Sequence, residues 1–500
     1  MNNPVQMGWH ARAAELKPRD QAFINGRYVD AASGERFDCF SPIDGRLLAR
    51  VAACDQADVD LAVSAARAAF DKGEWSQASP GYRKKALLAF ADLMAAQAKE
   101  LALLETLDMG KPIRFSLSVD IPSTVRCLRW YAEAIDKLYD QVAPTERNVL
   151  ATITREPVGV VGAIVPWNFP LIMAAWKFAP ALAAGNSIII KPSEKTPLSA
   201  LRIAELAMEA GLPEGVFNVV PGYGHTAGKA LALHGDVDCI SFTGSTATGK
   251  LMMQYAGQSN LKRVWLECGG KSPNIVMADV ENLEQAAKAA ASAIYFNQGE
   301  MCSAGSRLLV HESIKEVFLE RVMHYAGQFQ VGDPLDARTT LGALVDAGHL
   351  QRVQHYVTEA QQQGAQLRQG GSRQRESSGG YYYEPTLLEV TPQMTIAREE
   401  VFGPVLSAIS FRTEAEAIQI ANEVMYGLAA AVWTRDLNTA HRMSRALRAG
   451  LVYINCYDDD DITVPFGGYK QSGNGRDKSL HAFDKYTELK TTWIRLAQAP

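Results

Sequence analysis

Apolar residues recur along the chain with more than one period, and the period predicts which segments are helices and which are strands. Apolar side chains stand at helical spacing in residues 58–72, 80–106 and 119–139, which predicts a layer of amphipathic helices. In residues 80–106 the expected apolar face includes Leu87, Leu88, Ala91 and Leu93.

A continuous apolar run at residues 158–165 is typical of a strand buried on both faces. After it, short apolar strands alternate with helices. The expected strands are 158–165, 187–191, 216–220, 239–242 and 263–266, and the helices between them are 171–184, 198–210, 226–233 and 246–256. A second series of the same kind begins at Asn274. Strands that alternate with helices form parallel sheets, so the expected fold class is α/β.

Residues 142–156 have a third pattern, the alternation of a strand or hairpin. Val149, Ala151 and Ile153 fall on one side of it, and polar residues fall on the other. A strand with one polar face and no neighbour exposes unpaired backbone groups, so this ribbon needs a partner.

Length and composition narrow the class of protein. A chain of 500 residues exceeds one ordinary core, so two or three domains are expected. A hydrophobic content of 47% with 21% charged residues is typical of a globular protein. The net charge of −5 offers no basic face for nucleic acid, and no apolar run is long enough to span a membrane. Residues 1–20 lack the apolar core of a signal peptide, so export is not expected.

The cysteines argue against a disulfide framework. There are seven, an odd number, and no pair has CxxC spacing, so we expect neither disulfides nor a zinc site, and no metal. A reducing cytoplasm suits such a chain best.

One cysteine stands where chemistry is plausible. Cys302 follows an alanine-rich helical run, residues 286–294, and is followed by the small residues Ser303, Ala304 and Gly305. A thiol in this position is accessible to a small electrophile, but it attacks a carbonyl group only as the thiolate. An isolated cysteine is more often a small buried residue, so the interpretation depends on its neighbours.

The motifs around Cys302 resemble those of the aldehyde dehydrogenase superfamily. The resemblance runs from Phe23 to Trp493, in blocks at residues 166–170, 191–194, 242–245, 266–271, 296–302, 400–404 and 465–468. Each block is weak alone, but together and in this order they are specific. Blocks at residues 131–137 and 473–479 are most similar to the bacterial branch that oxidises γ-glutamyl-γ-aminobutyraldehyde and guanidinobutyraldehyde in polyamine and arginine breakdown.

The resemblance implies an organisation in three parts. Residues 1–140 and 158–267 are expected to form a Rossmann-like NAD-binding domain, and residues 268–478 a second α/β domain that carries the catalytic residues. Residues 141–157 and 479–500 are expected to form a small β element that builds the oligomer, with a homotetramer favoured over a dimer.

Two local patterns predict a dinucleotide site. Gly244-Ser245 follows a strand and opens a helix, which places free N–H groups and the positive end of the helix dipole where a phosphate can bind. Glu194, three residues after the strand end at Lys191, can accept from both ribose hydroxyl groups and would repel a 2′-phosphate, which favours NAD while leaving NADP possible. With the resemblance, the expected cofactor-binding residues are Val165, Pro166, Trp167, Lys191, Ser193, Glu194, Gly244, Ser245, Gly269, Glu400 and Phe402.

The resemblance also implies a catalytic cycle. Cys302 attacks the aldehyde, the side-chain amide of Asn168 and the backbone N–H of Cys302 hold the oxyanion, hydride passes to the nicotinamide, and water hydrolyses the thioester. Glu267 follows an apolar strand, where partial desolvation raises a carboxyl pKa toward the working pH, so it is the expected base. Lys177 and Asp477 match positions credited with proton relay, but many relatives have a glutamate in place of Asp477, and the relay role stays open.

The substrate end carries four consecutive carboxylates, residues 458–461. Such a run is either a solvated face or a clamp for a cationic aldehyde tail, and alternation along a strand favours Asp459 and Asp461 as the pair that faces the tunnel. Trp167, Trp176 and Tyr457 are candidate aromatic walls. The expected substrate-contacting residues are Trp176, Tyr457, Asp459, Asp460 and Asp461.

Other functions remain open at this point. A broad-specificity or betaine-type aldehyde dehydrogenase is one, and a relative that passes the acyl group to coenzyme A is another, although such relatives often lack the base that matches Glu267. A binding protein that has kept the fold and lost turnover would lack the nucleophile or the base, and this chain has both. The only ligands expected are the aldehyde and the cofactor, without nucleic acid or membrane.

Overall fold

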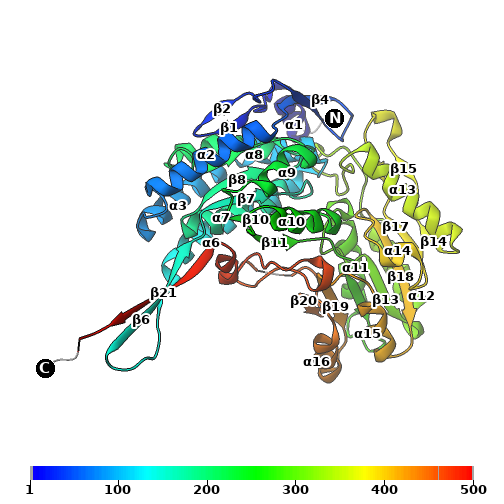
Figure 1. Cartoon of the computed structure of the whole chain (residues 1–500). Coiled ribbons are helices and arrows are strands. Elements are labelled where there is room, and N and C mark those ends of the chain that lie inside the picture. Colours follow the sequence, from blue (N-terminus) through cyan, green and yellow to red (C-terminus); the bar gives the residue numbers. More distant parts are fainter. Residues whose placement is uncertain (1–3, 460, 498–500) are drawn as a thin grey trace.

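Two seven-stranded sheets lie side by side and a β ribbon extends away from both, as Figure 1 shows. The computed structural model describes residues 4–459 and 461–497. Within these residues, no helix has the length and apolar character needed to cross a bilayer.

The first sheet has the strand order β11-β10-β7-β8-β9-β1-β2. Its strands are β1 (Ala22–Ile24), β2 (Arg27–Val29), β7 (Val160–Ile164), β8 (Ser187–Lys191), β9 (Phe217–Val219), β10 (Cys239–Thr243) and β11 (Arg263–Glu267). The five strands from β11 to β9 are parallel, whereas β1 pairs antiparallel with both neighbours. The chain adds β8 and β9 on one side of β7, then returns to add β10 and β11 on the other. The strand order therefore reverses between β7 and β10, which is where open α/β sheets bind ligands.

Helices cover both faces of this sheet. They are α2 (Gln56–Lys72), α3 (Pro80–Ala96), α4 (Ala98–Met109), α6 (Ile121–Ala134), α7 (Pro170–Ala184), α8 (Leu198–Glu209), α9 (Lys229–Leu233) and α10 (Thr246–Gln258). Val161 and Ala163 of β7 join the core with α3, α6, α7 and α8, whereas Val160 and Ile164 join the core with α2, α9 and α10. The continuous apolar run therefore forms a strand that is buried on both faces, as predicted.

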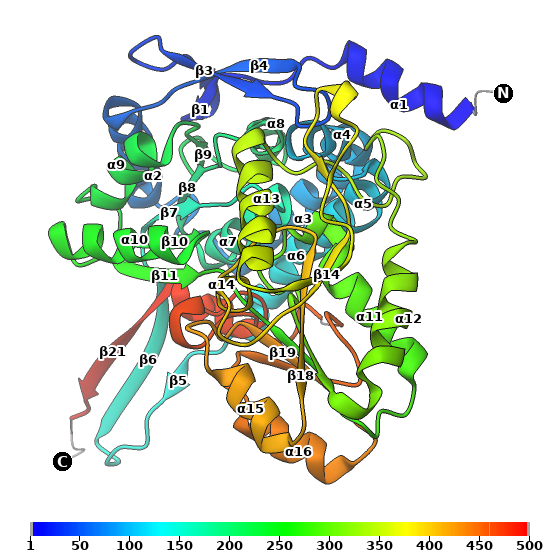
Figure 2. The same cartoon turned by 90° about the vertical axis from the view of Figure 1, so that its right-hand side faces the viewer.

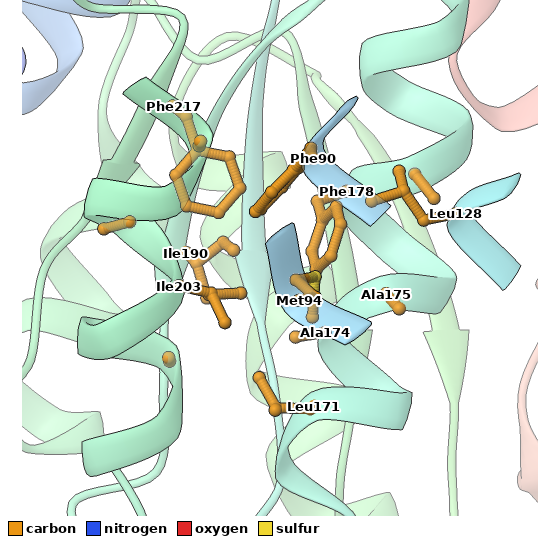
Figure 3. Close-up of a cluster of buried hydrophobic side chains, with 14 of the residues drawn as sticks. Phe90, Met94, Leu128, Leu171, Ala174, Ala175, Phe178, Ile190, Ile203 and Phe217 are labelled. Carbon is orange, nitrogen blue, oxygen red and sulfur yellow. The ribbon is translucent and has the colours of Figure 1, made fainter. Parts of the chain in front are cut away.

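The hydrophobic core beneath α7 fixes the position of this helix, which carries residues of the candidate active site. Figure 3 shows Phe90 of α3, Phe178 of α7 and Phe217 of β9 gathered between the helices and the sheet. Their ring centroids lie 5.6–5.9 Å apart, a spacing at which aromatic pairs gain about 0.5–1.5 kcal/mol beyond their area burial. Of the apolar face predicted for residues 80–106, Leu87 and Ala91 are fully buried, whereas Leu88 and Leu93 are half-buried and pack against the edge of the same core. The buried face of α3 is Ala86, Leu87, Phe90, Ala91 and Met94.

The second sheet has the order β14-β17-β18-β13-β12-β19-β20 and is parallel except for β14. Its strands are β12 (Pro273–Val276), β13 (Arg307–His311), β14 (Gln366–Gln369), β17 (Thr386–Glu389), β18 (Val405–Phe411), β19 (Ala429–Trp433) and β20 (Leu451–Ile454). Its helices are α11 (Leu283–Tyr295), α12 (Lys315–Ala326), α13 (Ala347–Gln362), α14 (Thr395–Arg398), α15 (Glu414–Asn422) and α16 (Leu437–Ala446). Helices α11 and α12 pack on one face, and the other four share a core with the opposite face (Figure 2).

The projecting ribbon joins distant parts of the chain. Strand β21 (Thr487–Arg495) pairs antiparallel with β6 (Val149–Pro157) along its full length, and β5 (Gln141–Val142) flanks β6. Val149 and Ala151 are buried, but the side chains of β21 beyond Thr487 are exposed, with Trp493 60% exposed. The predicted strand is therefore present as β6, and it pairs with the C-terminal strand β21 along its whole length.

Short elements complete the described residues. They are α1 (Pro4–Glu15), α5 (Ile113–Phe115) and the strand pairs β3 (Arg36–Phe40) with β4 (Leu47–Ala52) and β15 (Arg373–Gln374) with β16 (Tyr382–Tyr383). The segment between β20 and β21 runs back from the second sheet to the first (Figure 1). Residues of both sheets and of this returning segment can therefore meet at one place.

Candidate active site

A cleft of about 510 Å³ opens at the point where the first sheet reverses its strand order. Pro166 and Trp167 follow β7, and Thr243, Gly244 and Ser245 lie at the end of β10, so the two strand ends bring them to the same edge. Helix α10 begins here with Ser245 as its N-cap, whose hydroxyl oxygen accepts from the backbone N–H of Thr248 at 3.2 Å. Thr246, Ala247 and Lys250 of the same helix also line the cleft. A helix N-terminus next to a lysine at a strand-order reversal fits the pyrophosphate of a dinucleotide.

The structure brings together most of the residues that the sequence assigned to the cofactor. The cleft is lined by Pro166, Trp167, Gly244, Ser245, Gly269, Glu400 and Phe402. Four others do not border it. Lys191 is the last residue of β8, and the other three follow the ends of β7 and β8: Val165, Ser193 and Glu194. The Lys191 ammonium lies 3.3 Å from the Glu194 carboxylate, and burial lowers the pKa of Lys191.

An aromatic cluster forms one wall of the cleft, and one member was missed by the sequence reasoning. The Trp167 ring packs edge-on against Phe402 and His349, with centroids 5.2 and 5.3 Å away. His349 donates from Nε2 to the carbonyl oxygen of Phe402 at 2.6 Å. Burial lowers the pKa of His349 to about 4, so the ring is neutral at neutral pH. A lone histidine at the start of a helix carries no motif, which is why the sequence offered no signal for it.

Glycines let Glu400 approach the strand end closely. The Glu400 Oε1 accepts from the backbone N–H of Gly270 at 2.9 Å, and a side chain at Gly269 would overlap the same carboxylate. Burial raises the pKa of Glu400 to about 7. Gly269 therefore makes room for an acidic group in the cleft.

The turn that carries Cys302 is held in an unusual backbone conformation. Asn297 (φ 49°), Gln298 (φ 56°) and Gly299 (φ 73°) are three successive residues in the left-handed region, directly after α11. Such a conformation costs non-glycine residues about 1–3 kcal/mol each and persists where the surroundings hold it. Asn297 donates to the carbonyl oxygens of Asn168 and Glu300 at 3.2 and 3.1 Å, which fixes the turn against the end of β7.

Asn168 is positioned by the same network. Its Nδ2 donates to the carbonyl oxygen of Glu300 at 2.8 Å, and its side chain lines the cleft beside Cys302. A side-chain amide has two N–H donors, so one can anchor the group and the other can face a bound oxygen atom. Asn168 is thus placed as a prearranged donor near the thiol.

Glu267 is a buried carboxylate beside the thiol. In the described part of the chain neither of its oxygens makes a hydrogen bond of ordinary geometry. Burial raises its pKa to about 8, the nearby Lys177 and the Cys302 thiol lower it, and the nearby Asp477 raises it. The direction matches the sequence-based expectation of a carboxyl group whose pKa lies near the working pH.

Lys177 and Asp477 form a buried ion pair behind Glu267. The Lys177 Nζ lies 2.5 Å from the Asp477 carboxylate, and Lys485 binds its other oxygen. These two cations hold the pKa of Asp477 below its usual range despite its burial. Because each carboxylate oxygen of Asp477 binds a lysine, the geometry explains a structural role for the Lys177–Asp477 pair in support of the site.

A second pocket of about 290 Å³ reaches Cys302 from another side. Cys302 and Met173 line both this pocket and the cleft, so the thiol stands at their junction. Its aromatic walls are Phe169, Trp176, Phe296 and Phe466. This pocket provides the space in which an electrophile can reach the Cys302 thiol.

The structure corrects the sequence-based choice of acidic wall residues. In the described part of the loop Asp458 lines the pocket, whereas Asp459 and Asp461 do not. Asp458 has a positive φ of 56°, so this segment turns and the alternation of a strand does not apply. Asp461 instead accepts from the backbone N–H of Thr463 at 3.0 Å, and Asp460 lies outside the described residues.

Tyr457 was also misplaced by the sequence reasoning. Its hydroxyl group donates to the carbonyl oxygen of Ser303 at 2.7 Å, and its ring fills the space beside Gly305. It supports the residues after Cys302 from behind and is not part of the pocket wall. Trp176 does line the pocket, as expected, and Trp167 lines the cleft.

Comparison with known proteins decides the family. Residues 28–492 match the model of the aldehyde dehydrogenase family. The chain is 56% identical over 489 residues to the NADP/NAD-dependent aldehyde dehydrogenase PuuC of Escherichia coli (strain K12), covering 98% of each. It is 51% identical to an aminoacetaldehyde dehydrogenase of Pseudomonas aeruginosa, covering 97% of each.

The chain belongs to the aldehyde dehydrogenase family.

Solved structures agree with this assignment. The indole-3-acetaldehyde dehydrogenase AldA of P. syringae, a C302A mutant in complex with NAD+ and IAA, has a TM-score of 0.98 at 61% identity, covering 98% of this chain and 99% of that one. The γ-glutamyl-γ-aminobutyraldehyde dehydrogenase of Burkholderia cenocepacia J2315 has a TM-score of 0.97 at 59% identity, covering 98% and 100%.

As a member of this family, the protein is an NAD(P)-dependent oxidoreductase that acts on aldehydes. The α/β fold and the family predicted from the sequence are confirmed.

Burial raises the pKa of the Cys302 thiol, and the nearby Glu267, Glu400 and Asp458 raise it further. The thiol is therefore protonated at neutral pH in this arrangement, and it needs a proton acceptor before it can attack.

Proposed function

We propose that this enzyme oxidises an aldehyde to its carboxylic acid through a covalent adduct on Cys302. The observation that carries the proposal is the position of Cys302 at the junction of the dinucleotide cleft and the aldehyde pocket. Asn168, Glu267 and Cys302 have the roles of oxyanion donor, base and nucleophile.

The residues act in a fixed order. Glu267, close to the thiol, accepts its proton, and the Cys302 sulfur then forms a bond with the aldehyde carbon. The oxyanion that results accepts from the free N–H of Asn168 and from the backbone N–H of Cys302. NAD, when bound in the cleft, accepts the hydride that leaves this carbon, and a thioester remains on the sulfur. Glu267 then passes the thiol proton on to solvent, and as a carboxylate again it takes a proton from the water that attacks the thioester, which releases the acid and restores the thiolate.

The substrate we favour is an aminoaldehyde or γ-glutamyl aminoaldehyde of polyamine or arginine catabolism. Asp458 places a carboxylate in the wall of the aldehyde pocket, where it can attract an ammonium group. The similar aminoacetaldehyde and γ-glutamyl-γ-aminobutyraldehyde dehydrogenases support the same class. A coenzyme A-acylating activity is disfavoured by the buried Glu267, which provides a base for water.

NAD is the favoured cofactor. The Glu194 carboxylate stands beside Lys191 at the end of β8, at the edge where the ribose of a dinucleotide would reach it. A carboxylate there accepts from ribose hydroxyl groups and repels a 2′-phosphate. NADP remains usable because Lys191 offsets part of that charge.

The ribbon supports a homo-oligomer, with a tetramer favoured. Strand β21 exposes Leu489, Trp493 and Ile494, and Leu150 of β6 is exposed as well. Exposed apolar side chains on a strand pair that projects from the body favour contact with a second copy. Sedimentation of a Trp493→Asp variant should show smaller species than the wild type, and unchanged assembly would contradict the proposal.

The three-part division has structural support as well. One sheet belongs to residues 1–140 and 158–267, the second to 268–478, and the ribbon to 141–157 and 479–500.

All seven cysteines, which lie in the described residues, are free thiols, which supports a reducing cytoplasm as the location.

A substrate panel tests the proposed function. Purified protein is given NAD and neutral, aminated or γ-glutamylated aldehydes of equal chain length, and NADH is followed by its absorbance. We expect the aminated and γ-glutamylated aldehydes to have the larger kcat/KM. Equal values for all of them would contradict the proposed substrate class while leaving the aldehyde dehydrogenase activity intact.

A further inference from the structure

The first turn of α13 contacts parts of the chain that lie on both sides of the dinucleotide cleft. Asp346 is the N-cap of this helix, and its carboxylate lies 2.6 Å from the ammonium group of Lys195, which follows β8 of the first sheet. Three residues later, His349 lines the cleft and is only 9% exposed. The start of α13 is therefore fixed to the first sheet, although the helix packs on the second.

The turn that carries Cys302 is attached to the segment just before α13 by two of its side chains. The Gln298 Oε1 accepts from the backbone N–H of Gly342 at 3.1 Å, and the Glu300 Oε1 accepts from that of Val345 at 3.1 Å. Both side chains are buried, so breaking either bond would leave a polar group without a partner, which costs about 1–3 kcal/mol. The turn and the start of α13 therefore hold each other in place.

His349 extends this connection to Phe402. Its Nε2 lies 2.6 Å from the carbonyl oxygen of Phe402, and because a carbonyl oxygen can only accept, Nε2 carries the proton and donates. Phe402 has a φ of 61°, a left-handed conformation that a bulky residue keeps only where its surroundings hold it. The hydrogen bond from His349 is one of the contacts that hold it.

The contact between His349 and Glu300 is not an ion pair. The His349 Nε2 lies 3.7 Å from the Glu300 Oε1, which is too long for a hydrogen bond. Burial lowers the pKa of His349 and raises that of the Glu300 carboxyl group, so both are uncharged at neutral pH. The two side chains pack against each other, and the only hydrogen bond assigned to the His349 ring among the described residues is the one to Phe402.

The contacts form a closed ring, because the residue after Phe402 returns to the turn at Cys302. A Cβ atom at Gly299 would overlap the carbonyl oxygen of Gly403, so these two glycines are in direct contact. The ring runs from the turn through the start of α13 and His349 to Phe402, and through Gly403 back to the turn. A closed ring permits less displacement than any single contact in it, so the position of Phe402 is tied to that of Cys302.

We propose that His349 is a positioning residue for hydride transfer, which through its hydrogen bond to Phe402 holds the aromatic wall of the cleft in place relative to Cys302. The hydride leaves the carbon bound to the Cys302 sulfur for NAD bound in the cleft, and a misplacement of 1 Å in such a step costs about 100-fold in rate. The inference rests on the proposed reaction at Cys302. It adds to that reaction a residue that does not line the aldehyde pocket.

Two substitutions separate the hydrogen bond from the ring. His349→Phe keeps an aromatic ring and removes the donor, whereas His349→Gln removes the ring and keeps an N–H donor at a similar distance from the backbone. Calorimetry measures the dissociation constant of NAD without aldehyde, and NADH formation from propanal with enzyme in excess measures a single turnover.

The single-turnover rate should fall about 10- to 100-fold in His349→Phe. The dissociation constant of NAD should change less than about threefold, because the loss concerns the transition state more than the bound state. His349→Gln should recover most of the rate.

An isotope effect identifies the step that is slowed. Propanal deuterated at the aldehyde carbon transfers deuteride in place of hydride. If the transfer has become slower in His349→Phe, the ratio of kcat/KM for ordinary and deuterated propanal should be larger than in the wild type. Slower hydrolysis of the acyl adduct, or a smaller fraction of folded enzyme, would not enlarge this ratio.

Two control variants lie on the same helix. His355 is exposed and pairs with Glu359, so His355→Phe should leave the rate and the isotope effect as in the wild type. Val357 is buried in the core beside α13 and does not line the cleft. Val357→Ala should lower the temperature of thermal unfolding without changing the single-turnover rate of the folded enzyme.

The outcomes are distinct. The proposal is overturned if His349→Phe slows turnover no more than Val357→Ala does, if its isotope effect stays at the wild-type value, or if His349→Gln is as slow as His349→Phe. Failure of the proposed function has a different result, because Cys302→Ala would then retain turnover whatever His349→Phe does.

Discussion

The dinucleotide cleft and the aldehyde pocket share Cys302 and Met173 but are built in different ways. One side of the cleft is made from the ends of β7 and β10 and from the first turn of α10, and the facing wall, with His349, Glu400 and Phe402, comes from the part of the chain that forms the second sheet. The pocket takes its walls from α6, from α7, from the turn at Cys302 and from the segment that returns from the second sheet. One side of the cleft follows from the rules of a parallel sheet, whereas the whole pocket exists only where four distant segments meet.

The difference extends to the electrostatics at their junction. Besides burial and Glu267, one carboxylate from each region raises the pKa of the Cys302 thiol, Glu400 from the cleft and Asp458 from the pocket. The nucleophile therefore responds to both regions, although the two regions share only Cys302 and Met173 in their walls. Single substitutions should therefore affect the reaction at Cys302, the stability of the fold and the preference for a cofactor separately.

The largest effect is expected from the nucleophile. Cys302→Ala should lower kcat by at least about four orders of magnitude, since the sulfur forms the covalent bond, while NAD still binds in the cleft. NADH formation and a fluorescence titration with NAD measure the two properties. Cys456→Ala is the control, because Cys456 is the other partly buried thiol and packs against the same apolar cluster, and it should retain activity. Substantial turnover by Cys302→Ala would place the nucleophile elsewhere.

Removal of the base should stall the second half of the reaction. Glu267→Gln should slow thioester hydrolysis by about 100- to 10,000-fold, the usual range for a general base, and an acyl adduct on Cys302 should appear by mass spectrometry. In the wild type the deacylation rate should rise with pH and level off above about 8, because the carboxylate form of Glu267 accumulates as pH passes its raised pKa of about 8. The variant should show no such rise. Deacylation at the wild-type rate in Glu267→Gln would rule out this base.

The turn at Cys302 should be intolerant of a side chain. Gly299→Ala should destabilise the protein by about 3 kcal/mol or more, because φ is 73° and a Cβ atom would overlap the carbonyl oxygen of Gly403. Gly364 is a matched control with a φ of 95° and open space around it, so Gly364→Ala should cost only about 1–2 kcal/mol. Thermal unfolding of both variants is the measurement, and equal shifts would show that the contact with Gly403 is unimportant.

The smallest effect concerns cofactor preference. Glu194→Gln should lower the ratio of kcat/KM for NAD to that for NADP by about three- to tenfold, since a partly exposed carboxylate is screened by solvent. Glu209→Gln at the exposed end of α8 should leave the ratio unchanged. A Glu194→Gln enzyme with the wild-type ratio would show that the ribose does not reach this edge.

The sequence by itself determined the family, the α/β architecture and the chemistry at the strand ends. The hydrophobic period revealed the strands. Glu267 and Gly244-Ser245 were recognisable because Glu267 ends β11 and Gly244-Ser245 directly follows β10, at the edge where a parallel sheet gathers its functional groups. These features could be read from the sequence because the residues that define each of them are adjacent in the chain. The same is true of β7, whose unbroken apolar run already implied burial on both faces.

Only the tertiary structure decided the walls of the aldehyde pocket. The acidic run predicted Asp459 and Asp461, but a turn with a positive φ directs Asp458 inward instead. Lys478 and Arg126 are more than 300 residues apart and form one charged wall because the returning segment packs against α6. His349 reaches the cleft by the same kind of long-range packing. Side-chain direction in a turn and contact between distant segments depend on the whole fold, and no local pattern of residues encodes either.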